Sequence, residues 1–420
     1  MTIITDQPLS KRFHLLYFTA EQWPTFRPDV IALFGKYLPR HDITCDLVTE
    51  LDLTASDKPV PTWGAGRAIL CKVPKSRALQ YLVKFWHNLR TLIFMDASKY
   101  DAIQVRDMTV IALLGLVIAR IKGIRFFYWL SYPQSEGQID RARSRGIKGG
   151  MRFWFPLVQG TFGKWLLYRV ILPKADHIFL QSRQMQIDIV RHGIPVSKMT
   201  PVPMGVDTEL TNSADIQPAK DPRLDGKRVV AYLGTMDRVR QIEVLFHMLA
   251  IVRQQIPNIL LVLVGDTEDA THRDWLKQEA MRAGVIDNLL WAGWLSSLDA
   301  WTYVCAAEIG LSPFPRGFLL DSASPTKAVE YMALELPVVV NDNPDQAQVI
   351  AESGGGLCVN LDAKSFAEAV LSLINNRSLR SEMGILGKAY VGNVRSYKKL
   401  SFDLAGQYKN LMHSKVDSQI

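Results

Sequence analysis

A run of residues in the C-terminal third, 311–342, combines the residue types that bind a phosphate group. The pattern predicts a helix that begins with Ser324 as N-cap and Pro325 as first helical residue, because proline lacks an amide hydrogen that the first turn does not need. The helix N-terminus leaves amide groups free and carries the positive end of the helix dipole. The hydroxyl of Thr326 and the ammonium of Lys327 stand beside these amides, so we expect an anion site here.

A second anion-binding signal follows a predicted strand that ends before Gly234 and Thr235. Arg238 and Arg240 come next, ahead of a predicted helix. Open α/β sheets bind anions where a strand-end glycine leads into a helix. The two loops together predict a phosphate site in which Lys327 and a cation of this loop, Arg240 or alternatively Arg238, stabilise the negative charge.

Glu330 lies one helical turn after Lys327, and Glu330-Tyr331-Met332-Ala333 leads into an apolar strand at Pro337–Val340. At these residues the chain resembles the retaining nucleotide-sugar glycosyltransferases of the family 4 type, which have the two-domain GT-B fold. The resemblance implies that Glu330 binds the ribose hydroxyls of the donor nucleotide. Family members usually carry a further Glu that contacts the donor sugar, and Ser322 stands at that position here, with Asp321 beside it.

The resemblance covers the chain from Gly205 onward by motif and the first half by architecture. The segments Gly265-Asp266 and Gly293-Trp294-Leu295 match further family positions, which implies that the main chain around Trp294 and Leu295 faces the nucleobase. Asp266, with acidic neighbours, is interpreted as a residue that caps the following helix rather than as a metal ligand. We therefore expect neither a metal ion nor another cofactor.

Short apolar segments alternate with segments of helical length throughout both halves, which predicts an α/β fold with doubly wound, mostly parallel sheets. The predicted strands are 12–19, 43–49, 68–73, 102–105, 125–130, 177–181 and 199–203, then 229–233, 259–264, 289–291, 309–311, 337–340 and 357–359. The family resemblance implies the GT-B arrangement of two Rossmann-like domains that face each other across a cleft. The expected parts are an acceptor-binding domain (1–205), a nucleotide-sugar-binding domain (206–395) and a C-terminal helix (396–420) that crosses back to the first domain.

The composition supports two globular domains, because 48% of the 420 residues are hydrophobic. Residues 1–205 carry 28 Lys and Arg against 15 Asp and Glu, whereas the remainder carries 21 against 26. A basic first half indicates contact with a polyanion. The zinc-finger, RNP and helix-turn-helix signatures of nucleic-acid binding do not occur in the sequence, so no nucleic-acid partner is expected.

Scattered cysteines and a short apolar run indicate a cytosolic protein. Cys45, Cys71, Cys305 and Cys358 show no paired spacing and are expected to be buried, reduced thiols. The longest apolar run, 109–119, is shorter than the roughly 20 residues that span a bilayer, so it predicts a buried helix. The N-terminus shows no secretory signal.

The first domain is expected to bind the acceptor at the ends of its strands. The loop 20–27 lacks the paired glycines that relatives often have, and it offers Thr25 and Arg27 as contacts, with Trp23 either binding or packing. Arg106 ends another strand. Ser131 and Tyr132 follow the strand 125–130, and Ser131 stands where many relatives carry a histidine.

Basic residues and aromatic residues are mixed between residues 141 and 174 in a way that is typical of a surface lying on an anionic bilayer. The alternative is a basic loop followed by an ordinary core helix. The residues expected to contact the membrane are Arg141, Arg143, Arg145, Lys148, Arg152, Phe153, Trp154, Phe155 and Trp165.

These observations predict a cytoplasmic enzyme, attached peripherally to the inner face of the plasma membrane. It would transfer a sugar from a UDP- or GDP-sugar to a polyprenyl diphosphate-linked saccharide in surface polysaccharide biosynthesis. The alternative is a soluble glycosyltransferase that acts on a small molecule or a polymeric glycan.

Overall fold

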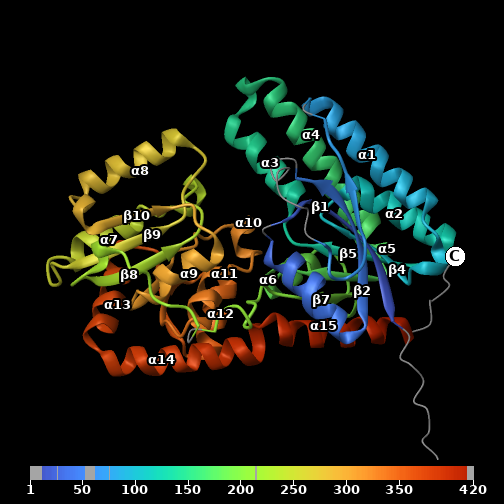
Figure 1. The fold of residues 1–420 in the computed structure, drawn as a ribbon. Helices are drawn as coiled ribbons and strands as arrows, with labels where there is room; N and C mark the ends of the chain where they lie inside the picture. The colour runs from blue at the N-terminus through green and yellow to red at the C-terminus, as the bar shows by residue number, and fades with distance from the viewer. Residues whose placement is uncertain (1–11, 26, 53–61, 75, 213–214, 414–420) are drawn as a thin grey trace, which may run out of the picture. The chain divides into compact units, whose positions relative to one another are not determined.

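The computed structural model describes residues 12–25, 27–52, 62–74, 76–212 and 215–413. The chain divides into two compact units, Met1–Val202 with Leu400–Ile420 and Pro203–Lys399. Each unit contains one parallel β-sheet with helices on both faces (Figure 1). This arrangement confirms the predicted α/β class with two Rossmann-like units.

The first unit has a seven-stranded sheet in the order β3-β2-β1-β4-β5-β6-β7. All the strand pairs are parallel. The order reverses between β1 and β4, so the chain leaves these two neighbouring strands in opposite directions. The strands are β1 (Phe13–Trp23), β2 (Ile43–Leu51), β3 (Ala68–Cys71), β4 (Ala102–Arg106), β5 (Arg125–Leu130), β6 (His177–Leu180) and β7 (Met199–Pro201).

Alternate residues of β1 point to opposite faces of the sheet, as the period of a strand requires. Leu16 and Phe18 pack in a core cluster with α1, α2 and the π-helical turn η6. Tyr17 stacks on Phe34 of η1, with ring centroids 4.6 Å apart, on the other face. The helical elements are η1 (Asp29–Tyr37), α1 (Arg77–Phe94), α2 (Thr109–Lys122), α3 (Gln134–Arg145), α4 (Met151–Leu166), η6 (Leu167–Ile171), α5 (Leu172–Lys174) and α6 (Arg183–Val190).

The last helix, α15 (Tyr397–His413), joins the first unit from Leu400 onward. Figure 1 shows it in red beside the blue and green elements of that unit. Its Tyr408 stacks on Phe13 at 5.5 Å, and the phenol donates a hydrogen bond of 2.6 Å to Gln104 of β4. A segment that is distant in sequence therefore completes the core on this face.

The second unit has a six-stranded parallel sheet in the order β10-β9-β8-β11-β12-β13. The order reverses between β8 and β11. Its strands are β8 (Arg228–Leu233), β9 (Ile259–Val264), β10 (Leu289–Gly293), β11 (Ile309–Ser312), β12 (Val338–Asn341) and β13 (Gly356–Val359).

Strand β9 shows why the sequence here is continuously apolar rather than alternating. Leu261 and Leu263 pack in a cluster with α7 and α13, while Leu260 and Val262 face the opposite side with α9. A parallel strand covered by helices on both faces has no polar side. The helical elements are α7 (Val244–Val252), α8 (Ala270–Arg282), α9 (Ser297–Cys305), α10 (Phe318–Asp321), α11 (Thr326–Ala333), α12 (Pro344–Ser353), α13 (Ala363–Asn375), α14 (Arg377–Tyr390) and η11 (Val391–Arg395).

Two expectations about local structure need correction. Strand β1 continues through Trp23 into the segment that was expected to be a loop, and Trp23 is buried, packing edge to face on Trp63 at 5.2 Å. The packing interpretation of Trp23 is therefore the one that the structure supports. Among the cysteines, Cys45 and Cys71 are buried, but Cys358 is exposed, so the expectation of four buried thiols is wrong there.

Candidate functional site

The predicted anion site lies at the point where the strand order of the second sheet reverses. The carboxyl ends of β8 and β11 are neighbours there, and the chain continues into Gly234 and into Pro313-Phe314 respectively. Ligands of open α/β sheets bind outside the carboxyl ends of the strands at this switch point. The topology thus brings together two loops that are about 80 residues apart in sequence.

Two cationic side chains meet over the ring of Phe314. The Lys327 ammonium lies 5.7 Å from the ring centroid, and the Arg240 guanidinium lies 4.6 Å from it. The Lys327 Nζ is also 5.3 Å from the ring centroid of Tyr232. Gly234 leaves room for the lysine, because a Cβ at Gly234 would lie 2.5 Å from Lys327 Cε.

Both cations lack an anionic partner. Lys327 is only 9% exposed, and Arg240 has two buried nitrogens, Nε and Nη1, without a hydrogen-bond acceptor. Within the described part of the chain, no carboxylate forms an ion pair with either residue. Burial first, and then repulsion from Arg240, lower the pKa of Lys327 to about 7. A bound phosphate would supply the missing charge and acceptors.

A cavity of about 140 Å³ is lined by Gly234, which lies against Lys327, and by the predicted nucleoside contacts. Glu330 lines it, and the Trp301 indole nitrogen donates a hydrogen bond of 3.4 Å to the Glu330 carboxylate. Sequence reasoning missed Trp301, because an apolar residue within a predicted helix is usually a core residue. The remaining lining residues are Leu233, Gly234, Val264, Gly265, Trp294, Leu295, Ser297 and Ala300.

The other predicted donor contacts surround this cavity and the cation pair. Trp294 and Leu295 line the cavity as partly exposed side chains. Arg238 is fully exposed in the turn that carries Arg240, and the Thr235 carbonyl accepts a hydrogen bond of 2.7 Å from Tyr232. The structure therefore places Arg240, rather than Arg238, against Lys327 and Phe314.

The start of helix α11 differs from the expectation. Pro325 has extended backbone angles and occupies the N-cap position, and Thr326 is the first helical residue. Ser324 does not cap the helix. Its hydroxyl accepts hydrogen bonds from the Met204 amide and Arg395 and donates one of 2.9 Å to Asp345, because the buried Arg395–Asp345 ion pair needs these polar partners.

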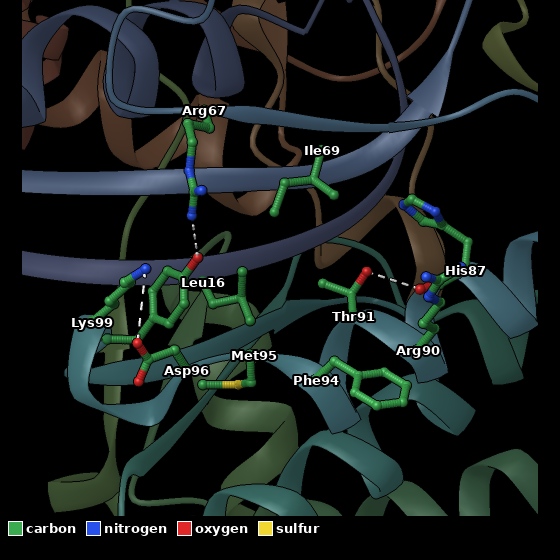
Figure 2. A pocket seen from close by; sticks show the side chains of 11 residues that line it. Leu16, Arg67, Ile69, His87, Arg90, Thr91, Phe94, Met95, Asp96 and Lys99 are labelled. Carbon is green, nitrogen blue, oxygen red and sulfur yellow. Dashed lines mark hydrogen bonds and ion pairs between the residues drawn. The ribbon is translucent and has the colours of Figure 1, made fainter.

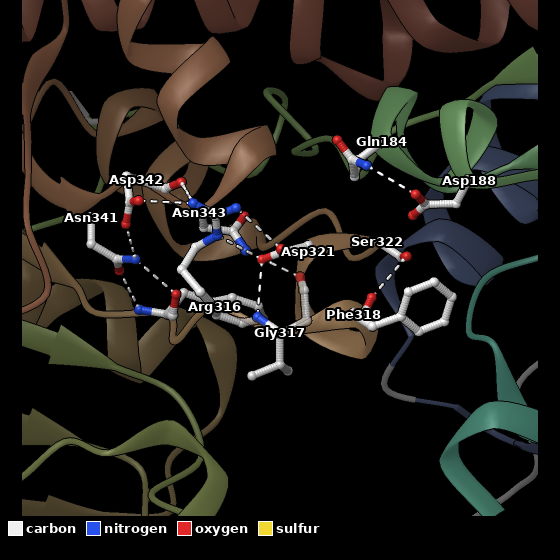
Figure 3. Close-up of polar contacts among 12 residues, drawn as sticks. Gln184, Asp188, Arg316, Gly317, Phe318, Asp321, Ser322, Asn341, Asp342 and Asn343 are labelled. Atoms are coloured by element: carbon white, nitrogen blue, oxygen red, sulfur yellow. Dashed lines mark hydrogen bonds and ion pairs between the residues drawn. The ribbon is translucent and has the colours of Figure 1, made fainter. Parts of the chain in front are cut away.

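The position of the family's sugar-binding Glu is occupied by side chains that already have partners (Figure 3). Ser322 is buried, and its hydroxyl donates to the Phe318 carbonyl at 3.0 Å. Asp321 binds Arg316 at 2.9 Å and accepts from the Gly317 amide, and Arg316 also holds Asp342 at 2.8 Å. Ser322 is also one of the residues predicted to contact the donor, and with its side chain buried in this way that contact stays a prediction.

The first unit has its own switch point, between β1 and β4, where Arg106 and Asp107 end β4. Arg106 is 1% exposed and forms an ion pair of 2.8 Å with Asp29. Its Nε donates to the Ser131 hydroxyl at 3.2 Å, and Asp107 accepts from the Ser131 amide at 2.8 Å. Arg106 is almost entirely buried and holds the Ser131 hydroxyl; a role for either residue in binding the acceptor stays a prediction.

The pKa values of the two buried carboxyl groups beside Arg106 are shifted in opposite directions. Burial opposes ionisation of Asp29, but Arg106 and Arg27 outweigh it and lower the Asp29 pKa. Burial raises the pKa of Asp107, because its interactions with Arg106 and Ser131 only partly compensate. Asp107 also adopts a left-handed backbone conformation with φ of 55°. Strained backbone and a carboxyl with raised pKa at a strand end are typical of functional sites.

The remaining predicted acceptor residues lie at the same edge of the sheet. Thr25 is buried, and its hydroxyl accepts from the Arg27 amide at 3.1 Å. Arg27 is half-buried and pairs with Asp29 at 3.4 Å. Tyr132 is 40% exposed, which leaves its ring accessible.

The predicted membrane-contact residues lie on α3, α4 and the turn between them. Gly160 and Gly163 let α3 and α4 approach closely, since a Cβ at Gly160 would lie 2.7 Å from the Ser135 carbonyl oxygen. The basic residues of this set are exposed, and the outer face of α4 presents exposed apolar side chains: Met151, Trp154, Phe155, Val158, Phe162 and Trp165. Phe153 is a correction, because it is buried and packs against Trp154.

Helices α1 and α2 also present apolar side chains to the outside, which the sequence analysis did not anticipate. Val110, Val117 and Ile121 are exposed on α2, so the helix expected to be buried is buried on one face only. A cavity of about 460 Å³ lies between α1 and the sheet. Figure 2 shows the side chains that line it. Two of its cations have carboxylate partners, since Arg67 pairs with Asp46 at 2.6 Å and Lys99 with Asp96 at 3.7 Å.

Within the described ranges, no helix has both the length and the hydropathy needed to cross a bilayer. The described residues also contain no group of His, Cys, Asp or Glu side chains arranged to hold a metal ion. Asp266 binds Arg273 at 2.7 Å.

Family models match both halves of the chain. Residues 18–205 match the glycosyl transferase 4-like domain, and residues 213–389 match the domain of glycosyl transferases group 1. The protein is a glycosyltransferase of the GT-B fold.

Solved structures show the same fold at low sequence identity. The glycosyltransferase is similar to sucrose-phosphate synthase from Thermosynechococcus elongatus, with 17% identity, a TM-score of 0.69 and coverage of 95% of this chain and 99% of that chain. HepE from Anabaena in complex with UDP-glucose shares 14% identity, with a TM-score of 0.66 and coverage of 94% and 99%. WaaG, a glycosyltransferase involved in lipopolysaccharide biosynthesis, shares 13%, with a TM-score of 0.68 and the same coverage. No curated protein sequence matches the chain.

Arg240→Ala is expected to weaken UDP binding about 10- to 100-fold, because charge-assisted hydrogen bonds contribute roughly 1.5–3 kcal/mol each. Arg238→Ala removes the same charge from an exposed neighbour and serves as the matched control. Isothermal titration calorimetry with UDP measures both variants. Equal affinities for Arg240→Ala and the wild type would contradict the phosphate role.

The lowered pKa of Lys327 predicts pH-dependent binding. The ammonium of the free protein loses its proton above about pH 7, whereas a bound diphosphate favours the charged form and raises this pKa. Binding therefore takes up a proton, and UDP affinity should fall by up to about tenfold per pH unit between pH 7 and 9. Calorimetry in buffers of different ionisation enthalpy measures the uptake, and Lys327→Met should abolish it. A wild-type affinity that is flat over this range would refute the assignment.

Glu330→Gln is expected to raise the KM for the donor by about tenfold or more, because a neutral amide is a weaker acceptor for two ribose hydroxyls than a carboxylate. Thermal unfolding should remain unchanged. Glu335→Gln, at the end of the same helix, is the control. A donor KM that does not change would remove the ribose assignment.

Proposed function

We propose that the enzyme transfers a sugar, with retention of anomeric configuration, from a nucleoside diphosphate sugar to a lipid-linked saccharide acceptor at the cytoplasmic face of the plasma membrane. The observation that supports the donor half is the buried Lys327 beside the half-buried Arg240, two of whose nitrogens are buried without an acceptor. The pair lies beside a cavity that contains Glu330. A nucleoside diphosphate matches this arrangement, with its phosphates at the cations and its ribose at the carboxylate.

The complexes of Anabaena HepE with UDP and with UDP-glucose support a UDP-sugar as the first donor to test. No metal ion is needed to neutralise the leaving diphosphate in this proposal. Two preorganised cations in a water-poor site stabilise charge that develops on the leaving group. Lys327 can hold its proton during this step, because the diphosphate raises its pKa again.

The surface of the first unit supports a lipid-linked acceptor. Exposed aromatic residues on α4 stand next to exposed arginines on α3, and this combination binds anionic bilayers. The involvement of WaaG in lipopolysaccharide biosynthesis is consistent with such an acceptor. Sucrose-phosphate synthase has the same fold, so the fold itself does not select the acceptor.

The direct test is an incubation with a panel of radiolabelled UDP- and GDP-sugars and membranes that contain polyprenyl diphosphate-linked saccharides. Transfer of label into the organic-soluble fraction is the expected result. Label that appears only in water-soluble glycosides or polymer would support the alternative, a soluble glycosyltransferase, and overturn the lipid-linked acceptor.

Membrane attachment predicts that the protein floats with liposomes that contain anionic phospholipid at low salt and is released as salt rises. The double variant Trp154→Ser, Phe155→Ser should lose most of this binding. Ile385→Ser, Leu386→Ser removes a similar exposed apolar pair from α14 and is the control. Wild-type protein that remains in the soluble fraction would refute the membrane contact.

A further inference from the structure

We propose that a second cavity beneath α1, different from the one in Figure 2, binds the hydrocarbon chain of the acceptor lipid. It lies between α1, the start of α2 and the sheet of the first unit. The inference rests on the proposed function, because it assumes an acceptor that carries a lipid. It adds a second site on the first unit, one that binds the chain and not the saccharide.

The cavity has a volume of about 410 Å³, within the roughly 300–1,000 Å³ of typical ligand sites. Its surface is mainly apolar. Tyr81 and Phe85 of α1 line one side, and Met108, Val110 and Ile111 line the other at the start of α2. The floor is formed by the ends of three strands, with Thr19 and Ala20 of β1, Thr49 and Glu50 of β2, and Cys71 of β3.

The position of the cavity places a bound hydrocarbon chain beside the residues that are predicted to bind the acceptor. The cavity lies at the carboxyl ends of β1, β2 and β3, the same sheet edge at which Arg106 and Asp107 end β4. Met108, which lines the cavity, directly follows Asp107, whose carboxylate accepts from the Ser131 amide. A chain in the cavity would therefore direct the attached head group toward Asp107 and Ser131.

The only ionic groups that line the cavity neutralise each other. Among the described lining residues, Lys84 and Glu50 are the charged ones besides His87, and they form an ion pair of 2.6 Å from α1 to β2. The cavity thus offers no net charge to a phosphate. This favours an occupant whose apolar part enters the cavity while its charged part stays outside.

Helix α1 supports a lipid as the occupant, because it turns a stripe of apolar side chains outward. Leu79, Leu82, Trp86 and Ile93 follow one helical face, and they are 51%, 66%, 67% and 48% exposed. The side chains toward the two cavities beneath the helix include the polar residues Lys84, His87, Asn88 and Thr91. A surface helix of a soluble protein normally turns its apolar stripe inward.

An apolar outer face suits a helix that lies at the surface of a bilayer. Val110 belongs both to the wall of the cavity and to the exposed apolar face of α2, so apolar surface continues from the outside of the helix layer into the cavity. A lipid chain can enter along this surface without contact with water. The same continuity distinguishes the cavity from an ordinary packing defect in the core.

The test is a chain-length series of alkyl phosphates, from butyl to dodecyl, titrated below micelle formation with inorganic phosphate as the chain-free control. Binding should strengthen about fourfold per added methylene, the fold-change that corresponds to ~0.8 kcal/mol for a buried CH₂. It should then level off at the length that fills the cavity. Affinity that is independent of chain length, or that rises without a plateau as in partition onto a surface, would overturn the proposal.

Two variants locate the binding. Ala20→Trp places a large ring at an exposed position of the cavity lining and should weaken binding of the longest chain at least tenfold. Ile121→Trp adds the same ring to an exposed position of α2 outside the cavity and should leave binding unchanged. Val110→Trp is a second blocking variant if Ala20→Trp folds poorly. Equal chain affinity in the blocking and control variants would also overturn the proposal.

The experiments distinguish a failure of the cavity proposal from a failure of the proposed function. Plateau binding of alkyl phosphates without any transfer of sugar to lipid-linked saccharides would refute the proposed acceptor while the cavity remained a chain site. A second outcome is that Ala20→Trp transfers sugar to lipid-linked saccharides as the wild type does, while binding of alkyl phosphates does not depend on chain length. This outcome would refute only the chain-binding role of the cavity. UDP affinity in Ala20→Trp should equal that of the wild type in either case.

Discussion

Burial of a lysine beside a second cation is the constraint around which the donor half of this enzyme is arranged. Lys327 and Arg240 share the ring of Phe314, and no described carboxylate forms an ion pair with them. The free protein tolerates this arrangement by lowering the pKa of the lysine. A polyanionic ligand would remove the repulsion between Lys327 and Arg240 when it binds. The relief of this repulsion would add to the free energy of binding.

Several residues of the second unit hold Lys327 and the start of α11 in position. Gly234 leaves the space that the lysine side chain occupies. The buried ion pair between Arg395 and Asp345, together with Ser324, ties the segment before α11 to Met204. Truncating one partner of such a pair leaves an uncompensated buried charge, which is strongly destabilising. Helix α11 is short, so it depends on these neighbours for the position of its N-terminus.

Both sheets contain a point where the strand order reverses, but the residues at the two points differ in their chemistry. In both, the strand order reverses between two neighbouring parallel strands, and polar residues gather at the carboxyl ends. The second unit presents unpaired cations there. The first unit presents a buried network in which Arg106 is shared by Asp29 and Ser131, and Asp107 has a raised pKa. A network of this kind orients hydroxyls and carboxylates, which suits the recognition of a neutral sugar better than that of a phosphate.

The outer helices of the first unit depart from the usual pattern of a globular domain. Helices α1, α2 and α4 each turn apolar side chains outward, and α1 places polar residues toward the sheet. Such a distribution lowers stability in water, because apolar area stays exposed and polar groups are partly desolvated. It becomes favourable when a lipid phase covers the outer face. The predicted membrane-contact residues lie on α3, α4 and the turn between them, and the exposed apolar faces of α1 and α2 extend this surface.

The sequence by itself determined the parallel sheets and the residues at their ends. Unbroken apolar segments such as 259–264 are expected only where helices cover both faces of a strand, and local chemistry pointed to Gly234, Arg240, Lys327 and Glu330. The tertiary structure alone decided which partners these residues have. Trp301 reaches Glu330 from another helix, Ser324 serves a buried ion pair instead of capping α11, and Phe153 turns inward beside Trp154. Residue type and spacing describe a chain one element at a time, whereas burial and pairing depend on which elements the fold brings into contact.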